Sequence, residues 1–117
     1  MAWTDYSSAP VPGTRICAAA AITGVHPLTV TTERGAFPLI VLRDGDAVRA
    51  FVNACPHQYL PLDYRGSTLL SADGRRLLCT AHGASFDRTT GAALSGADCG
   101  LDAVPVMQKG DHIVIAP

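Results

Sequence analysis

The sequence lacks any extended run of Lys or Arg, and its formal net charge is −1 at pH 7. Proteins that bind nucleic acid usually carry a basic patch, because it neutralises phosphates. The longest apolar stretch, Ile16–Ile22, is far shorter than the roughly 20 residues that a membrane-spanning helix needs. The sequence therefore predicts neither nucleic acid nor a membrane as a partner.

Aromatic residues are also scarce, at 6% of the chain, and charged residues make up only 16%. The hydrophobic fraction is 48%, which argues against disorder and requires a core built mainly from aliphatic side chains. A length of 117 residues suits one domain. With 11 Gly and 8 Pro residues, the chain favours short strands joined by turns over long helices.

The N-terminal segment is polar and contains Pro, and it has neither the basic nor the apolar region of a signal peptide. We therefore expect a cytoplasmic location, with residues 1–13 as an N-terminal arm and residues 14–117 as a single domain. The chain has 4 Cys. In a reducing compartment, cysteines with histidines at fixed offsets favour metal binding over disulfides.

Turn signals between apolar stretches predict an all-β fold. Phe37–Arg43 and Ala47–Asn53 flank an Asp-Gly turn and predict a β-hairpin. Val104–Gln108 and His112–Ile115 predict a last hairpin around a Lys-Gly-Asp turn, and Arg76–Cys79 a short strand that leads into a loop. Short strands at regular spacing indicate an antiparallel β-sandwich or a partly open barrel.

Three further stretches complete the expected order of elements. Thr14–Ile22 favours a first strand, although its run of Ala leaves a helix as an alternative. Residues 23–36 are interpreted as a polar connection with Thr and Gly. Phe86-Asp87, followed by Thr90-Gly91, predicts a tight hairpin.

Two loops carry residues that can bind a metal. The first contains Cys55-Pro56-His57 and the second Cys79-Thr80-Ala81-His82-Gly83, each directly after a predicted strand. Two thiolates and two imidazoles can hold zinc in a tetrahedral site, so a structural zinc module is one alternative. Zinc fingers usually pair Cys with Cys and His with His, whereas here each loop supplies one of each.

Cys-x-His followed by Cys-x₂-His-Gly resembles the Rieske iron–sulfur motif. The flanking residues 53–57 and 82–87 are similar to the loops of Rieske ferredoxins, and the resemblance extends over most of residues 14–116. It implies a Rieske-like fold with a small cluster-binding subdomain, whose loops comprise about residues 53–65 and 79–88. It also implies one Rieske-type [2Fe–2S] cluster as the cofactor.

The resemblance assigns a ligand to each iron. Cys55 and Cys79 would bind the buried iron, and His57 and His82 the outer iron near the surface. Neutral imidazoles leave such a cluster less negative than four thiolates do, so it accepts an electron more readily.

The neighbours of the second loop bear on the reduction potential. High-potential members of the family have a Ser two residues after the second His and a Tyr two residues later, and both hydroxyls donate hydrogen bonds near the cluster. Those positions are Ala84 and Phe86 here. High-potential respiratory members also carry an extra disulfide between the loops, and the corresponding neighbours here are not Cys. We therefore predict a potential near the bottom of the Rieske range of roughly −150 to +300 mV.

The function that the resemblance implies is electron transfer without catalysis. We expect a one-electron carrier, a ferredoxin, whose protein partners are a reductase and an acceptor such as a terminal oxygenase. The sequence shows no paired carboxylates placed for acid–base chemistry and no Ser/His/Asp set, so no motif in it suggests an enzyme. The alternative is a Rieske accessory subunit or redox-sensing module of a larger complex.

The remaining cysteines and histidines have simpler interpretations. Cys17 is expected to be a small buried hydrophobic residue in the first strand. Cys99, within residues 96–101, either approaches the cluster or is a structural thiol. His26 is expected in a solvated loop, and His112 is expected to open the last strand as an edge residue.

Overall fold

The computed structural model describes residues 2–56, 59–81 and 83–117. Within these residues the regular structure consists of ten strands and two short 3-10 turns, with no α-helix, which confirms the predicted all-β class. The chain divides into two compact units, residues 1–52 with 103–117 and residues 53–102. The strands are β1 Arg15–Ala18, β2 Val25–Thr32, β3 Gly35–Asp44, β4 Ala47–Val52, β5 Arg76–Leu78, β6 Ser85–Asp87, β7 Ala93–Ser95, β8 Ala103–Val104, β9 Val106–Lys109 and β10 His112–Ile115.

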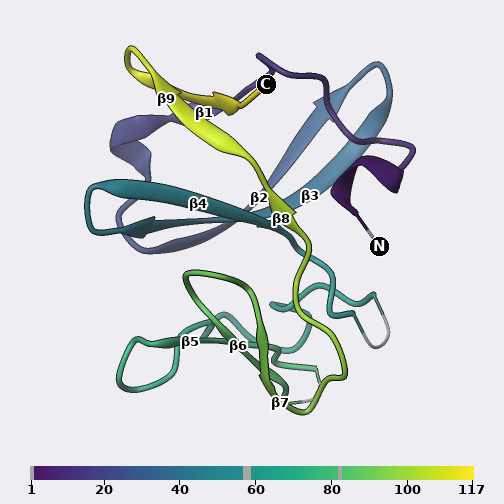
Figure 1. Cartoon of the computed structure of the whole chain (residues 1–117), viewed down its shortest axis with the longest axis vertical. Helices are drawn as coiled ribbons and strands as arrows, with labels where there is room; N and C mark the ends of the chain where they lie inside the picture. Colours follow the sequence, from purple (N-terminus) through teal and green to yellow (C-terminus); the bar gives the residue numbers. More distant parts are fainter. Residues whose placement is uncertain (1, 57–58, 82) are drawn as a thin grey trace. The chain divides into compact units, whose positions relative to one another are not determined.

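The larger unit contains two antiparallel sheets, with strand orders β2-β3-β4-β8 and β1-β10-β9 (Figure 1). The predicted hairpin around the Asp-Gly turn is present, with Asp44 of β3 paired to Ala47 of β4. Gly45 takes a φ of 63° in the turn between them, a conformation that glycine adopts without steric cost.

The expectation of a polar connection over residues 23–36 is wrong. Most of that segment is β2, which pairs with β3 from Val25↔Leu42 to Thr32↔Gly35. Its Val and Thr residues are β-branched and favour extended backbone. Pro27 is tolerated because β2 is an edge strand and needs no second set of hydrogen bonds. His26 is therefore in a strand, where its Nε2 accepts a hydrogen bond from the Thr23 N–H at 3.3 Å.

The predicted first strand is shorter than expected. Strand β1 ends at Ala18, and Ala19–Ala21 form a 3-10 turn. The guanidinium of Arg43 donates hydrogen bonds to the carbonyls of Ala19 and Ile22, at 3.0 and 3.3 Å. The Arg43 side chain thus satisfies two backbone carbonyls that would otherwise need N–H donors from a neighbouring strand.

Pro105 divides the predicted strand Val104–Gln108 in two. Before it, β8 pairs with β4, and after it, β9 pairs with β10. The chain thus passes from one sheet to the other at a residue that cannot donate a backbone hydrogen bond. The last hairpin is present as predicted, but His112 opens the central strand of its sheet, not an edge strand.

The core of the larger unit is aliphatic, as the composition predicts. Phe37 and the four residues Leu39 to Leu42 of β3 are fully buried. Because successive side chains of a strand point to opposite faces, both faces of β3 are removed from water. Burial of each such side chain contributes about 1.5–3 kcal/mol.

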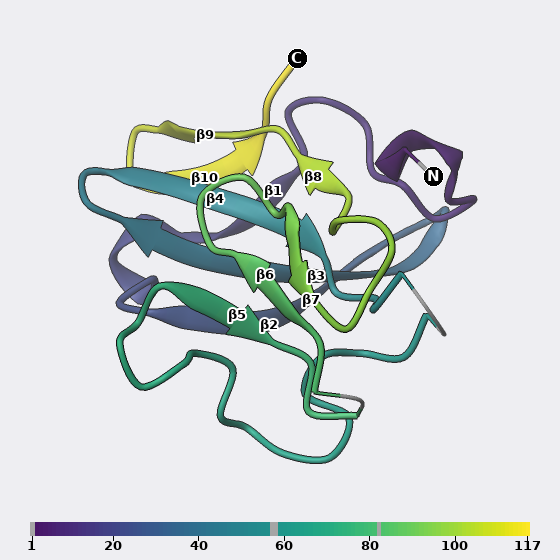
Figure 2. The ribbon, with the colours of Figure 1, turned by 60° about the horizontal axis from the view of Figure 1, so that its bottom comes forward.

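The smaller unit contains the three-stranded sheet β5-β6-β7, whose strands are labelled in Figure 2. It includes the short strand predicted before Cys79 and the tight hairpin predicted at Phe86-Asp87. Leu62, Leu77 and Phe86 are fully buried.

Among the described residues of the whole chain, no helix is long and apolar enough to cross a membrane.

Gly96 contacts the second cysteine loop through its backbone. Its φ is +76°, and a Cβ at this position would lie 2.9 Å from Ala84 Cα. Gly74 has a similar φ of +72°, but a Cβ there would have no neighbouring atom within 4 Å. This second glycine therefore isolates the cost of the backbone conformation from the cost of the clash.

We expect Gly96→Ala to lower the free energy of unfolding more than Gly74→Ala does. The left-handed conformation costs both variants about 1–2 kcal/mol. The clash adds about 1–3 kcal/mol for Gly96→Ala alone, because the packed loop must move. Chemical denaturation of both variants measures the difference, and equal losses would contradict the close packing of Gly96 on Ala84.

Candidate metal centre

The two cysteine loops have the same backbone hydrogen-bond pattern. The Cys55 N–H donates to the carbonyl of Leu60 at 2.8 Å, and the Tyr59 N–H donates to the Cys55 carbonyl at 2.6 Å. In the second loop the Cys79 N–H donates to the carbonyl of Ala84 and the Gly83 N–H to that of Cys79, both at 2.8 Å. Each cysteine thus closes its loop at both its N–H and its carbonyl.

Both loops also contain a left-handed residue four positions after the cysteine. Gly83 has a φ of 75°, and Tyr59 has a φ of 58°. Among the described residues, Tyr59 alone adopts positive φ without being glycine. A side chain in this conformation costs about 1–2 kcal/mol, so the first loop is strained at a position where the second has glycine.

We expect Tyr59→Gly to raise the free energy of unfolding, by up to about 1 kcal/mol. The change removes the steric cost at positive φ, which exceeds the added backbone entropy of glycine in the unfolded chain. Tyr64→Gly is the matched control, because both tyrosines are exposed, at 55% and 57%. That control should lose about 0.5–1 kcal/mol, as glycine usually does. Equal losses in denaturation experiments would show that Tyr59 is not strained.

The two loops are joined to each other through Leu62 and Thr80. The Leu62 carbonyl accepts hydrogen bonds from the Thr80 N–H at 2.8 Å and from the Thr80 hydroxyl at 2.6 Å. The buried Asn53 accepts from the Leu62 N–H at 2.7 Å and donates to Asp63 at 3.0 Å. The two segments that carry Cys55 and Cys79 are therefore joined by direct bonds. Sequence reasoning missed the positioning roles of Asn53, Leu62 and Thr80, because no motif marks these residues beyond their closeness to the cysteines.

The two cysteine side chains fit an iron–sulfur site. Cys55 and Cys79 are buried, at 0% and 1% exposure, and all four cysteines of the chain are thiols. A cluster needs thiolate donors shielded from water, on loops that a scaffold holds in place. His57 and His82 lie outside the described residues. The described residues alone contain no group of three metal-binding side chains, so the assignment of all four ligands remains a prediction.

The residues after the second cysteine loop are packed tightly. Ala84 and Phe86 are fully buried. The hydroxyls of Ser85 and Ser95 share a hydrogen bond of 2.8 Å between β6 and β7, beside the contact of Gly96 with Ala84. The hydroxyl of Ser85, the residue after Ala84, is therefore hydrogen-bonded to β7.

Asp87 stabilises the turn that follows β6. Its Oδ1 accepts hydrogen bonds from the N–H groups of Thr90 at 2.9 Å and Thr89 at 2.8 Å. These bonds lower the pKa of the Asp87 carboxyl, and the bond from Thr90 has the largest effect. A lowered pKa means that the bonds stabilise the fold above the ordinary pKa of Asp, and that this stabilisation is lost as the pH falls.

The other two cysteines differ in their surroundings. Cys17 is only half-buried, not buried as expected, and partial burial raises the pKa of its thiol while Arg15 lowers it. Cys99 is exposed in the smaller unit. Its exposure sets it apart from the two buried cysteines of the loops.

Comparison with known proteins agrees with the fold. The Rieske [2Fe-2S] domain family matches residues 14–105. The ferredoxin of carbazole 1,9a-dioxygenase from Nocardioides aromaticivorans IC177 is 27% identical, with a TM-score of 0.68 over 92% of this chain and 99% of its own. Sphingomonas yanoikuyae B1 ferredoxin is also 27% identical, with a TM-score of 0.70 over 90% and 98%. No curated protein sequence matches this chain.

An antiparallel β fold that holds two buried cysteines on matching loops suits a domain that binds a metal through thiolates. The family match covers most of the sequence, and the chain belongs to the Rieske [2Fe-2S] domain family. The cofactor of this family is one Rieske-type [2Fe–2S] cluster, and the predicted recognition, fold and cofactor are confirmed.

Proposed function

We propose that this protein is a one-electron carrier that receives electrons from a reductase and delivers them to a protein acceptor such as a terminal oxygenase. The observation that carries the proposal is the similarity, over nearly the full length of both chains, to ferredoxins of about the same size. A third similar structure, 28% identical with a TM-score of 0.67 over 87% of this chain and 99% of its own, is described as a complex of reduced oxygenase and oxidized ferredoxin in carbazole 1,9a-dioxygenase. The proposed location is the cytoplasm.

The proposed ligands are Cys55 and Cys79 for one iron, and His57 and His82 for the other. When bound, the cluster supplies a site that gains and loses one electron. The buried thiols of the two cysteines exclude water from their side of the site. The paired backbone bonds of each loop fix the position of its cysteine, so little reorganisation is needed when the charge changes.

The protein's own role is to transfer electrons and not to catalyse a reaction. Its proposed domain comprises residues 14–117, with residues 1–13 as an arm. Tyr59 and Tyr64 lie in the first loop and are more than half exposed, so they offer apolar area to a partner protein. The reductase and acceptor are proposed to dock beside the loops, because electron transfer requires short distances.

A redox titration followed by EPR spectroscopy tests this function. We expect a reddish-brown protein that takes up one electron and, when reduced, gives an EPR signal with a lower average g than clusters with four cysteine ligands. The midpoint should lie near the bottom of the range of roughly −150 to +300 mV. A colourless protein loaded with zinc would overturn the proposal, and a midpoint above about +100 mV, well inside that range, would overturn its low-potential part.

A further inference from the structure

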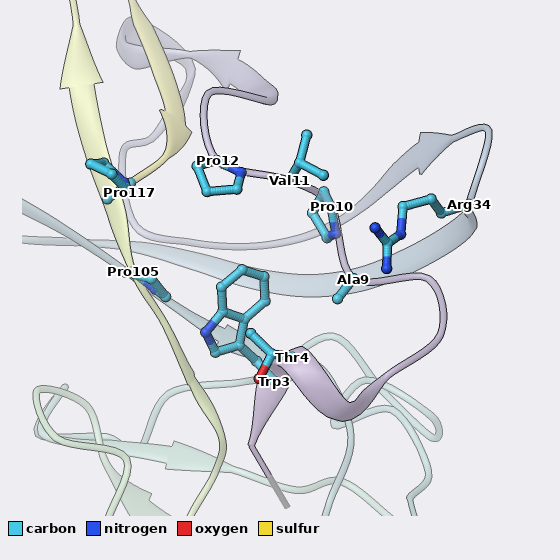
Figure 3. Close-up of a pocket in the computed structure, with 10 residues that line it drawn as sticks. Trp3, Thr4, Ala9, Pro10, Val11, Pro12, Arg34, Pro105 and Pro117 are labelled. Carbon is cyan, nitrogen blue, oxygen red and sulfur yellow. The ribbon is translucent and has the colours of Figure 1, made fainter.

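A pocket of about 400 Å³ lies in the larger unit, and none of the residues that line it belongs to the cysteine loops. It is formed by the N-terminal arm, the turn between β2 and β3, and the C-terminal segment (Figure 3). Its volume is within the range of sites that bind small molecules, about 300–1,000 Å³. The electron-carrier function does not require this pocket.

The walls of the pocket are apolar and offer few hydrogen-bond donors. Four of the lining residues are prolines, which present rings and have no backbone N–H. They are Pro10, Pro12, Pro105 and Pro117. The indole of the half-buried Trp3 forms a further wall.

The aromatic wall is fixed by its own contacts. Trp3 packs edge-on against Phe37, with ring centroids 6.2 Å apart and an interplanar angle of 61°. Tyr6 packs on the same ring at 5.7 Å and 80°. Phe37 is fully buried, so the indole rests on the core of the unit, and the pocket exists before a ligand arrives.

Arg34 is the one charged side chain among the described residues that line the pocket. In Figure 3 its guanidinium extends from the β2–β3 turn toward Ala9 and Pro10. Its side chain forms no hydrogen bond or ion pair with the described residues. Its neighbour Glu33 does not line the pocket, and the carboxylate of Asp5 accepts the Ala2 N–H at 3.1 Å.

We propose that this pocket binds a small aromatic carboxylate. A flat aromatic ring can pack against the indole of Trp3, as aromatic pairs do, and the proline rings supply further apolar walls. The carboxylate pairs with the forked donors of Arg34, a geometry that guanidinium matches in a bidentate way. A cationic ligand is disfavoured, because no acidic side chain lines the pocket among the described residues and Arg34 would repel it.

The chain provides its own reporter for a test, because Trp3 is its only tryptophan. We expect benzoate to change the Trp3 fluorescence saturably at millimolar concentration, and to shift the indole N–H signal in NMR spectra. At constant ionic strength, benzamide tests the charge and acetate tests the ring. Each should bind at least tenfold more weakly than benzoate.

Two arginine variants complete the experiment. Arg34→Gln should weaken benzoate binding at least tenfold, whereas Arg15→Gln removes an exposed charge of the same unit and should leave binding unchanged. The proposal is overturned if neither signal saturates with benzoate, if benzamide or acetate binds as well as benzoate, or if both variants bind benzoate like the original protein.

Discussion

Cys79→Ala should yield a folded protein without the iron–sulfur cluster. Cys79 follows β5 directly, is 1% exposed and closes its loop through its own backbone. Its backbone bonds survive the substitution, and only the sulfur ligand is lost. One thiolate cannot hold an iron that requires two, so iron and sulfide should fall from about two of each per chain to background. Iron analysis and visible absorption measure the loss.

The two cysteines outside the loops serve as matched controls. Cys17→Ala and Cys99→Ala remove a half-buried and an exposed thiol and should retain the full cluster and its spectrum. Cys55→Ala, His57→Ser and His82→Ser should behave like Cys79→Ala or give a changed cluster. A Cys79→Ala protein with unaltered iron content and spectrum would refute the ligand assignment, as would loss of the cluster in Cys99→Ala alone.

The stability of the Cys79→Ala variant also tests the loop geometry. Truncation of a small buried side chain costs stability, yet the hydrogen bonds that join Leu62 and Thr80 do not involve the sulfur. We therefore expect circular dichroism to show the same β structure. A metal site that also organises the fold would instead leave the apo variant unfolded, as structural zinc modules often are.

Local sequence signals were enough to predict much of the fold. Asp-Gly and Lys-Gly-Asp turns between apolar stretches place the hairpins of β3 with β4 and of β9 with β10, because turn chemistry acts over a few residues. A local signal of the same kind marks the two candidate cysteines, whose role as ligands stays a prediction. Their Cys/His spacing is local and rare by chance, and both are buried on loops after strands.

Features that depend on distant residues could not be predicted in the same way. Strand β2 was missed because its Thr-rich sequence resembles a loop until β3 pairs with it along its whole length. The 3-10 turn at Ala19–Ala21 depends on Arg43, which arrives from another strand. The bonds between Leu62 and Thr80 likewise arise only when the two loops meet. Each depends on tertiary contacts, which override local propensity.

Ala84→Ser combined with Phe86→Tyr should raise the midpoint potential of the cluster. Both positions are fully buried, and they follow the second cysteine loop where high-potential members of the family have hydroxyls. The backbone of Gly96 packs closely on Ala84, so the fold and the cluster content of the variant are measured before its midpoint potential is compared. A new donor stabilises the reduced, more negative state more than the oxidised state.

The size of the effect follows from the strength of such bonds. A hydrogen bond to a charged group contributes about 1.5 kcal/mol or more. For a one-electron couple, about 1.4 kcal/mol is a tenfold change in equilibrium, or 59 mV. Each hydroxyl that bonds selectively to the reduced state should therefore raise the midpoint by roughly 60 mV.

The single variants and a control on the neighbouring strand separate this effect from general disturbance. Ser95→Ala removes the hydroxyl that bonds Ser85 but adds no donor, so the midpoint should change by much less than the double variant's shift. Protein-film voltammetry or a dye-mediated redox titration measures each midpoint potential. If the double variant folds with a full cluster and its midpoint does not rise, missing hydroxyls do not explain the predicted low potential. If Ser95→Ala alone raises the midpoint as far, loop packing sets the potential instead.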